Sequence, residues 1–155
     1  MNKKIKLLFM DVDGTLTDGK IYMGENGEVM KAFDIKDGYA IAHILPKMEI
    51  IPVIITGRTS KIVENRAKEL GITELYQDID NKLGVMLDVI RKYKCTEENV
   101  AYIGDDLPDI QCMKKCAMAG CPADAVQEVK EICQYICNKK AGCGAVREFI
   151  DRILK

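Results

Sequence analysis

Carboxylate side chains gather in this sequence at points where apolar runs of strand length end. Asp11 and Asp13 directly follow the run 5–10, and further acidic residues follow the run 100–103. In an open parallel sheet such positions meet at one edge, beyond the carboxyl ends of the strands. Carboxylates held together repel one another unless a cation lies between them, and Mg²⁺ takes oxygen ligands. The pattern therefore predicts a magnesium site. The carboxylates available to it are those of Asp11, Asp13, Asp105, Asp106 and Asp109.

The elements that would position these side chains follow an α/β pattern, because apolar runs of strand length alternate with stretches of helical period. Strands are predicted at residues 5–10, 50–55, 100–103 and 117–119, and residues 135–137 form either a fifth strand or a helix. Helices are predicted at residues 39–45, 60–70, 82–93, 108–115, 123–132 and 145–154. We therefore expect a Rossmann-like parallel sheet with helices on both faces, in a single domain over residues 1–155.

One segment, about residues 20–33, breaks this alternation. Asn26 and Gly27 stand there between two short strand-like runs, and Asn-Gly is a strong signal for a tight hairpin turn. We expect a β-hairpin inserted after the first strand, standing beside any site built at Asp11.

Four motifs of this sequence resemble those of the haloacid dehalogenase superfamily in order and spacing. They are residues 11–17 (DVDGTLT), residues 56–58 (TGR), Lys82, and residues 104–109 (GDDLPD). The first motif is highly specific, and the resemblance covers essentially the whole chain. It implies a magnesium-dependent phosphatase that works through a covalent aspartyl-phosphate.

The resemblance also implies a role for each metal ligand and catalytic residue. Asp13 lends its backbone carbonyl to the metal, Asp105 is the second carboxylate, and Asp106 or Asp109 contributes directly or through water. Asp11 is expected to attack phosphorus. Asp13 is expected to protonate the departing alkoxide and later to take a proton from the attacking water. The Thr56 hydroxyl and the Lys82 ammonium are expected to bind the phosphoryl oxygens and stabilise their charge. Phosphate monoesters hydrolyse so slowly in water that these groups must lower the barrier by about 20 kcal/mol or more.

The sequence has no room for a cap domain over this site. Only the hairpin lies between Thr17 and Asp37, and the stretch from Arg58 to Asp105 is too short to hold one. We therefore expect the site to be open in a single chain. An open site either acts on macromolecules or is closed by a neighbouring subunit.

Four further segments resemble the capless 3-deoxy-D-manno-octulosonate 8-phosphate phosphatases. They are residues 17–19 (TDG), 33–38 (FDIKDG), 75–77 (LYQ) and 142–148 (GCGAVRE). Those enzymes form tetramers in which hairpins meet at the centre and an adjoining subunit covers the site. The resemblance thus implies a homotetramer here, acting on a small sugar-acid phosphate.

The same resemblance implies which residues bind the rest of the substrate. Arginine suits a sugar-acid phosphate, because its guanidinium binds a carboxylate or phosphate through a bidentate fork. For Arg66 an ion pair with a neighbouring glutamate is an equal alternative. The implied substrate-binding residues are Asp34, Lys36, Asp37, Gly38, Gly57, Arg58, Arg66 and Arg147.

Composition argues against several other classes of partner. Lys and Arg number 23 and Asp and Glu 24, so the sequence offers no basic surface for nucleic acid. The apolar run 5–10 is too short for a signal peptide or a membrane span. The seven cysteines, an odd number, are interpreted as free thiols that pack as small apolar side chains. We expect a cytoplasmic protein without membrane or nucleic-acid partners.

Three rival interpretations remain. The substrate could instead be a nononate or N-acylneuraminate 9-phosphate. The phosphatases for those substrates resemble a pattern with an acidic residue at the position of Arg58, which favours the eight-carbon substrate. A phosphoacceptor signalling domain also carries acidic residues after its first strand. Its phosphorylated Asp, however, ends a later strand, where this chain has Thr56. A non-catalytic remnant is disfavoured because Asp11 and Asp13 are both intact.

Overall fold

Six strands form one parallel sheet within residues 4–155, the part of the chain that the computed structural model describes. Their order across the sheet is β5-β4-β1-β6-β7-β8. The strands are β1 (Leu7–Met10), β4 (Ile51–Ile55), β5 (Glu74–Tyr76), β6 (Val100–Ile103), β7 (Met118–Cys121) and β8 (Tyr135–Ile136). Leu7 of β1 pairs with Ile51 on one side and with Val100 on the other. The predicted parallel sheet is thereby confirmed, and the chain order reverses at β1.

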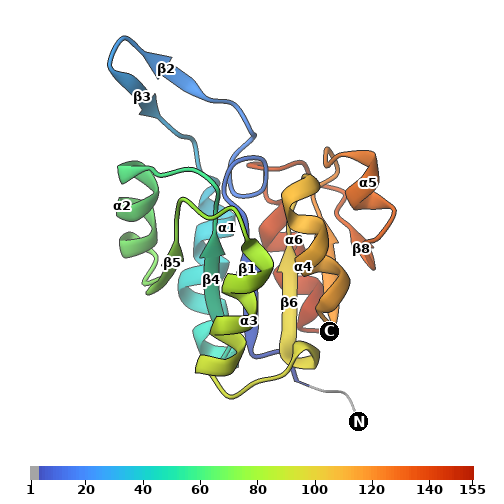
Figure 1. The fold of residues 1–155 in the computed structure, drawn as a ribbon. Coiled ribbons are helices and arrows are strands. Elements are labelled where there is room, and N and C mark those ends of the chain that lie inside the picture. Colours follow the sequence, from blue (N-terminus) through green and yellow to red (C-terminus); the bar gives the residue numbers. More distant parts are fainter. Residues whose placement is uncertain (1–3) are drawn as a thin grey trace.

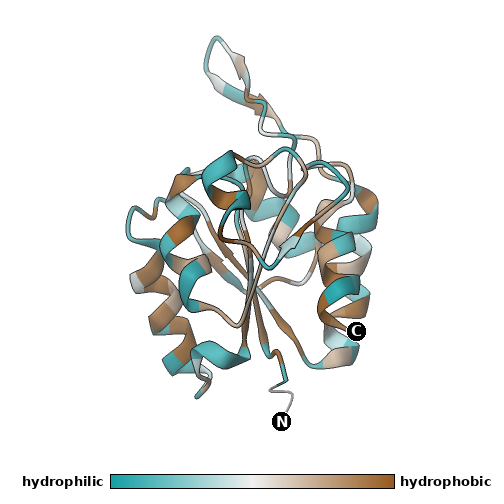
Figure 2. Cartoon of the chain, turned by 90° about the vertical axis from the view of Figure 1, so that its right-hand side faces the viewer, coloured by the Kyte–Doolittle hydropathy of each residue, from teal (hydrophilic) through white to brown (hydrophobic). Residues whose placement is uncertain are grey.

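Helices cover both faces of this sheet (Figure 1, Figure 2). One face carries α1 (Ile35–Tyr39), the π-helical turn Ala40–Ile44 that continues it, α2 (Lys61–Glu69) and α6 (Ala145–Ile153). The other carries α3 (Lys82–Lys92), α4 (Ile110–Lys115) and α5 (Gln127–Lys130). Short 3₁₀ turns lie at Pro46–Met48, Glu97–Asn99 and Leu107–Asp109.

The side chains of β1 alternate between two hydrophobic cores. Leu8 and Met10 enter the core formed with α2 and α6, whereas Leu7 and Phe9 enter the core formed with α3 and α4. All four are completely buried. A strand that is covered on both faces has apolar side chains on both, so apolar and polar residues do not alternate along β1. The residues that follow β1 are therefore held firmly at the sheet edge.

The predicted hairpin is present as β2 (Tyr22–Gly24) and β3 (Gly27–Met30), which pair antiparallel. It projects beyond the carboxyl ends of the sheet strands (Figure 1). The φ angle of Gly27 is +114°, a conformation that favours glycine and closes the tight turn. Met23 and Val29 are 62% and 60% exposed. The hairpin thus presents apolar side chains outside both cores.

Two helices differ from the sequence prediction. The helix predicted at residues 39–45 begins earlier, at Ile35, because the Asp34 side chain accepts hydrogen bonds from the amides of Lys36 and Asp37. Such a carboxylate cap fixes the helix start more strongly than the apolar period does. The helix predicted at residues 123–132 shortens to α5, because the Val126 amide binds the carbonyl of Asp105 instead.

The edge strand β5 was not predicted at all. It has three residues and begins with the acidic Glu74, so no apolar run marks it. Between Arg58 and Asp105 the chain forms only α2, β5, α3, a 3₁₀ turn and β6. This range therefore contains no cap domain, as predicted. Within residues 4–155, no helix has the length and apolar character needed to cross a membrane.

Candidate active site

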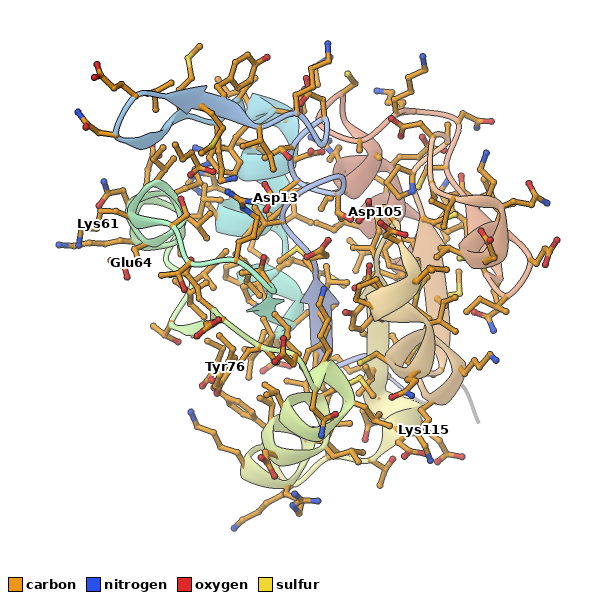
Figure 3. All side chains as sticks on the ribbon, turned by 45° about the horizontal axis from the view of Figure 1, so that its top comes forward. Asp13, Lys61, Glu64, Tyr76, Asp105 and Lys115 are labelled. Carbon is orange, nitrogen blue, oxygen red and sulfur yellow. The ribbon has the colours of Figure 1, made fainter. Side chains whose placement is uncertain are left out.

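A cavity of about 310 Å³ lies at the carboxyl ends of β4, β1 and β6. This is the point at which the chain order of the sheet reverses, the usual binding position in open α/β sheets. Asp13 and Asp105 approach it from the ends of β1 and β6, on the hairpin side of the molecule (Figure 3). All four predicted catalytic residues and all five predicted metal ligands line it. The lining residues are Asp11, Asp13, Thr56, Gly57, Arg58, Ile79, Asp80, Lys82, Asp105, Asp106, Pro108 and Asp109.

Three of these carboxylates form a tight cluster. Oxygen atoms of Asp11, Asp105 and Asp109 all lie within 4.8 Å of one another. Burial, followed by the nearby charge of Asp109, raises the pKa of Asp11. Burial and the charge of Asp11 raise the pKa of Asp105 to about 8. A divalent cation among these oxygens would relieve the repulsion, and the all-oxygen donor set suits Mg²⁺. The residues present therefore fit magnesium.

Asp109 differs from the other two carboxylates, because both of its oxygens are already occupied by donors. Its Oδ1 accepts hydrogen bonds from Lys82 Nζ at 2.9 Å and from the Tyr102 hydroxyl at 2.7 Å. Its Oδ2 accepts from the amides of Asp105 at 3.1 Å and Asp106 at 3.3 Å. This arrangement suits a residue that orients Lys82 and the loop after β6. The other two carboxylates have more oxygen capacity left for a metal.

Lys82 opens α3 and reaches into the cluster. The Asn81 side chain accepts a hydrogen bond from the Gly84 amide and caps the helix, which fixes where Lys82 begins. Lys82 Nζ lies 3.1 Å from Asp11 Oδ1, and the side chain is 5% exposed. Burial alone would lower the pKa of Lys82, but the charges of Asp11 and Asp109 outweigh it and raise the pKa. The site thus holds a buried ammonium beside the predicted nucleophile.

Two glycines let backbone pack closely against the carboxylates after β6. A Cβ at Gly14, whose φ is +87°, would lie 2.1 Å from Asp105 Oδ2, and one at Gly104 would lie 2.4 Å from Asp109 Cγ. The Thr15 hydroxyl donates to Asp105 Oδ1 at 3.0 Å. Glycine is therefore required at both positions for the three carboxylates to come together.

The Asp13 carboxylate turns away from the three-carboxylate cluster. Its Oδ1 accepts a hydrogen bond from Lys31 Nζ at 2.5 Å, and its Oδ2 lies 3.9 Å from Arg58 Nε. Asp106 also lies outside the cluster, because its Oδ1 accepts from the Leu107 amide and caps the 3₁₀ turn. Neither carboxylate therefore joins the cluster of Asp11, Asp105 and Asp109. For Asp13 the ligand that the resemblance implies is the backbone carbonyl.

The Thr-Gly-Arg motif follows β4 on the other side of the cavity. Thr56 is buried, and its amide donates to the carbonyl of Tyr76 at 3.0 Å, which extends the pairing of β4 with β5. Gly57 and Arg58 line the cavity with it, and the Arg58 side chain is 45% exposed. A phosphoryl group bound at Asp11 would therefore meet a hydroxyl and a guanidinium from this motif.

Sequence reasoning missed three charged residues beside this site. Asp80 lines the cavity two residues before Lys82, a spacing that alone gave no signal. Glu28 and Lys31 come from the hairpin and reach Asp13 and Arg58. The hairpin was expected beside the site, but nothing in its sequence indicated which side chains turn inward.

The remaining residues implied in substrate binding lie elsewhere, around α1 and the start of α6. Asp37 is buried, and its Oδ1 accepts a hydrogen bond from the Arg147 amide at 2.8 Å. Burial raises the pKa of Asp37 to about 6, against the effect of that hydrogen bond. The Arg147 side chain pairs with Asp151 at 3.2 Å. Lys36 belongs to α1, which Asp34 caps.

Arg66 joins the same group of residues. A Cβ at Gly38 would lie 2.4 Å from Arg66 Nη2, so the two are in close contact. Arg66 pairs with Glu69 at 3.1 Å, which is the ion pair considered as its alternative role. Asp34, Asp37, Gly38 and Arg66 border a separate small cavity of about 10 Å³. A single chain therefore divides the implied substrate-binding residues between two places.

Comparison with known proteins defines the class of this site. The family model described as haloacid dehalogenase-like hydrolase matches residues 70–150. The 3-deoxy-D-manno-octulosonate 8-phosphate phosphatase of Escherichia coli is 47% identical over 152 residues, which cover 98% of this chain and 80% of that protein.

Solved structures agree with this assignment. The crystal structure of the Yersinia pestis phosphatase of the same name has a TM-score of 0.94 and 44% identity, covering 99% of this chain and 82% of that chain. That of Moraxella catarrhalis, in complex with magnesium ion, phosphate ion and a KDO molecule, has a TM-score of 0.93 and 40% identity. The match covers 99% of this chain and 87% of that chain.

The fold and the site are those of a haloacid dehalogenase-like hydrolase. The chain is a hydrolase of phosphoric monoesters, and its metal is Mg²⁺. Within that class, the chain belongs to the family of 3-deoxy-D-manno-octulosonate 8-phosphate phosphatases.

Proposed function

We propose that this enzyme hydrolyses 3-deoxy-D-manno-octulosonate 8-phosphate to the free sugar acid and inorganic phosphate, with Mg²⁺ as cofactor. The observation that carries the proposal is the cluster of Asp11, Asp105 and Asp109, two of them buried, with the Lys82 ammonium bound to Asp11 and Asp109. Family membership supplies the substrate class, because the relatives named above carry this activity in their names.

The proposed reaction has two steps. In the first, an Asp11 oxygen attacks phosphorus, the bond from phosphorus to the sugar oxygen breaks, and Asp13 protonates that oxygen. In the second, Asp13 takes a proton from water as the water attacks the aspartyl-phosphate, which releases phosphate and restores Asp11. Two groups, the Lys82 ammonium and the Thr56 hydroxyl, stabilise charge on the phosphoryl oxygens in both steps.

The metal would be held by Asp11 and Asp105, with the backbone carbonyl of Asp13 as the family resemblance implies. When bound there, Mg²⁺ supplies positive charge that offsets the negative charges of Asp11 and of the phosphoryl group. The donors that already occupy Asp109 give it a different role, to hold Lys82 in place.

A phosphate-release assay over sugar-acid phosphates tests this function. The eight-carbon 8-phosphate should be turned over best, ahead of nononate and N-acylneuraminate 9-phosphates. Turnover should disappear in excess chelator, return with Mg²⁺, and be absent in Asp11→Asn. Preference for a nine-carbon substrate would transfer the proposal to that sugar acid. Robust turnover by Asp11→Asn, or by the wild-type enzyme in excess chelator, would contradict the mechanism.

We also propose that the enzyme works as a homotetramer in which a neighbouring subunit covers each site. Two observations support this. Within one chain, the cavity at Asp11 and the residues around Asp37 lie apart, so a second copy would be needed to bring both sets to one substrate. In addition, the hairpin exposes Met23, Val29 and Met30. Such apolar side chains are typical of a surface covered by a partner.

Mass in solution tests the assembly. The wild-type chain should have the mass of a tetramer, and Val29→Glu should lower it and reduce turnover of the sugar-acid phosphate. Ile136→Glu is the matched control, since Ile136 is also a half-exposed apolar residue but belongs to the edge strand β8. A monomeric wild-type enzyme with full activity would overturn the shared site. We further propose a cytoplasmic location, which the seven free cysteines favour.

A further inference from the structure

Lys31 has an unusual position for a residue at the root of an exposed hairpin. It directly follows Met30, the last residue of β3. Met30 is 54% exposed, and Val29 before it is 60% exposed. The Lys31 side chain, by contrast, is only 1% exposed. It therefore turns back from the hairpin to the body of the molecule. A lysine is seldom buried to this extent unless its ammonium is paired.

The ammonium of Lys31 binds two carboxylates. Its Nζ lies 2.5 Å from Asp13 Oδ1 and 2.8 Å from Glu28 Oε2. Glu28 is held in turn by the Ser60 hydroxyl, which donates to Glu28 Oε1 at 2.7 Å. Ser60 is the N-cap of α2. One chain of contacts thus runs from the catalytic loop through the hairpin to the body of the fold.

Arg58 closes this group of charges from the side of the cavity. Its guanidinium lies 3.9 Å from Asp13 Oδ2 and 3.7 Å from Glu28 Oε2. Asp13 therefore has Lys31 at one oxygen and Arg58, a residue of the cavity lining, near the other. The contact with Lys31 restricts rotation of the carboxylate and leaves Oδ2 on the side where a substrate would lie.

A purely structural role is the simplest alternative, in which Lys31 and Glu28 only attach the hairpin. An exposed ion pair would contribute about 0–1 kcal/mol and need no particular partner. Here, however, the Lys31 side chain is 1% exposed, its partners Glu28 and Asp13 are only 14% and 19% exposed, and Asp13 is the predicted acid/base. Carbon side chains at positions 28 and 31 could attach a hairpin equally well without desolvating three charges.

We infer that Lys31 is a positioning residue for the acid/base step, holding the Asp13 carboxylate toward the leaving oxygen, and that Glu28 holds Lys31 in turn. The inference rests on the proposed function, in which Asp13 protonates the departing oxygen. It adds that the hairpin carries part of the catalytic apparatus of its own chain.

The leaving group provides the test. An alkyl phosphate needs its oxygen protonated as it departs, whereas p-nitrophenolate is a good leaving group and departs without an acid. Lys31→Met should lower kcat for the alkyl phosphate that the wild-type enzyme turns over best by about 100-fold, the scale of general acid catalysis. KM should change little. The rate of the p-nitrophenolate burst, which reports attack by Asp11 alone, should stay within about threefold of wild type.

Three further variants keep the test decisive. Lys31→Arg retains a cation and should recover part of the lost alkyl turnover. Glu28→Gln retains the hydrogen bond from Ser60 but removes the charge beside Lys31, so it should show the same selective loss, to a smaller extent. Lys61→Met is the matched control, because Lys61 is an exposed lysine on α2 whose ion pair within residues 4–155 is with Glu64. It should change neither rate.

Equal losses on both substrates, a change in KM alone, or an unchanged alkyl rate would overturn the inference. If Lys31→Met fails to fold, Lys31→Arg and Glu28→Gln carry the same comparison. The comparison needs only one alkyl and one aryl phosphate. A mistaken sugar acid would therefore leave it intact, whereas an inactive wild-type enzyme would count against the proposed function itself.

Discussion

Gly14 and Asp105 are in direct contact at the edge of the sheet, although they lie ninety-one positions apart in the chain. A Cβ at Gly14 would lie 2.1 Å from Asp105 Oδ2. The φ angle of Gly14 is +87°, so the backbone there also favours glycine. The carboxylate of Asp105 is thus placed against the loop that carries Asp11, and its position depends on the absence of a side chain at Gly14.

This contact predicts that Gly14→Ala destroys the metal site. The methyl group should displace Asp105 and lower activity by more than about 100-fold, with a loss of stability of about 1–3 kcal/mol from the left-handed backbone. Gly71→Ala is the matched control, since its φ is +74° and a Cβ there meets nothing within 4 Å. It should show the loss of stability alone. Magnesium titration and urea unfolding measure the two effects, and full activity in Gly14→Ala would contradict the prediction.

Asp105 also predicts how stability depends on pH in the absence of magnesium. Burial and the charge of Asp11 raise its pKa from 3.8 to about 8. Between these values the folded protein holds a proton that the unfolded chain has lost, so ionisation of Asp105 lowers the stability of the fold as pH rises. Asp105→Asn should remove this loss, with a Tm about 2–4 °C or more above wild type at pH 8.5 and little difference near pH 4.

The same variant should be inactive at every pH, because it lacks a metal ligand. Saturating magnesium should remove the advantage of Asp105→Asn by stabilising only the wild-type enzyme. Thermal unfolding across the pH range, with and without Mg²⁺, gives the comparison. Parallel pH curves for the two proteins would show that Asp105 is not the group responsible.

We expect removal of the Lys82 ammonium from its buried group of charges to lower the stability of the fold strongly. Lys82→Met leaves Asp11 and Asp109 buried without their cation, which should lower the free energy of unfolding by about 3–5 kcal/mol. Magnesium should recover part of this stability but not the activity, since the phosphoryl oxygens have lost their ammonium. The half-exposed Lys115, 3.7 Å from Glu97, provides the control. Lys115→Met should cost less than about 1 kcal/mol and leave turnover unchanged.

Much of the catalytic centre could be predicted from the sequence, because parallel strands force distant segments to meet. The predicted buried strands correspond to β1, β4 and β6, which are followed directly by Asp11, Thr56 and Gly104. Each strand thus brings the polar residues after it to the same edge of the sheet. Local signals also identified the hairpin, since Asn26-Gly27 encodes a turn by its own backbone preferences. These features depend on short stretches of chain, which a sequence displays directly.

Features that depend on contacts between distant side chains could not be predicted in the same way. Lys31 reaches Asp13 only because the hairpin folds back, and its spacing from Glu28 matches neither a strand nor a signal of burial. Asp109 was predicted as a ligand, but its four donors come from three parts of the chain. The short edge strand β5 is held by its pairing with β4 rather than by any apolar pattern.

We expect the Tyr102 hydroxyl to affect catalysis although it does not touch the substrate. Tyr102 is buried in β6 and donates to Asp109 Oδ1 at 2.7 Å, the same oxygen that holds Lys82. Tyr102→Phe should lower the free energy of unfolding by about 1.5–3 kcal/mol, the range for a hydrogen bond to a charged group. It should also lower kcat several-fold, because Asp109 then restrains Lys82 less firmly.

Tyr93→Phe separates these two effects. The Tyr93 hydroxyl likewise donates to a carboxylate, Glu74 Oε1 at 2.6 Å, but this pair lies where α3 ends beside β5, away from the cavity. The variant should therefore lose stability and keep its kcat. Steady-state kinetics on the folded proteins, together with urea unfolding, distinguish the outcomes. An unchanged kcat in Tyr102→Phe would show that Lys82 does not depend on this support, since Asp109 would then hold the ammonium in place with the remaining donors alone.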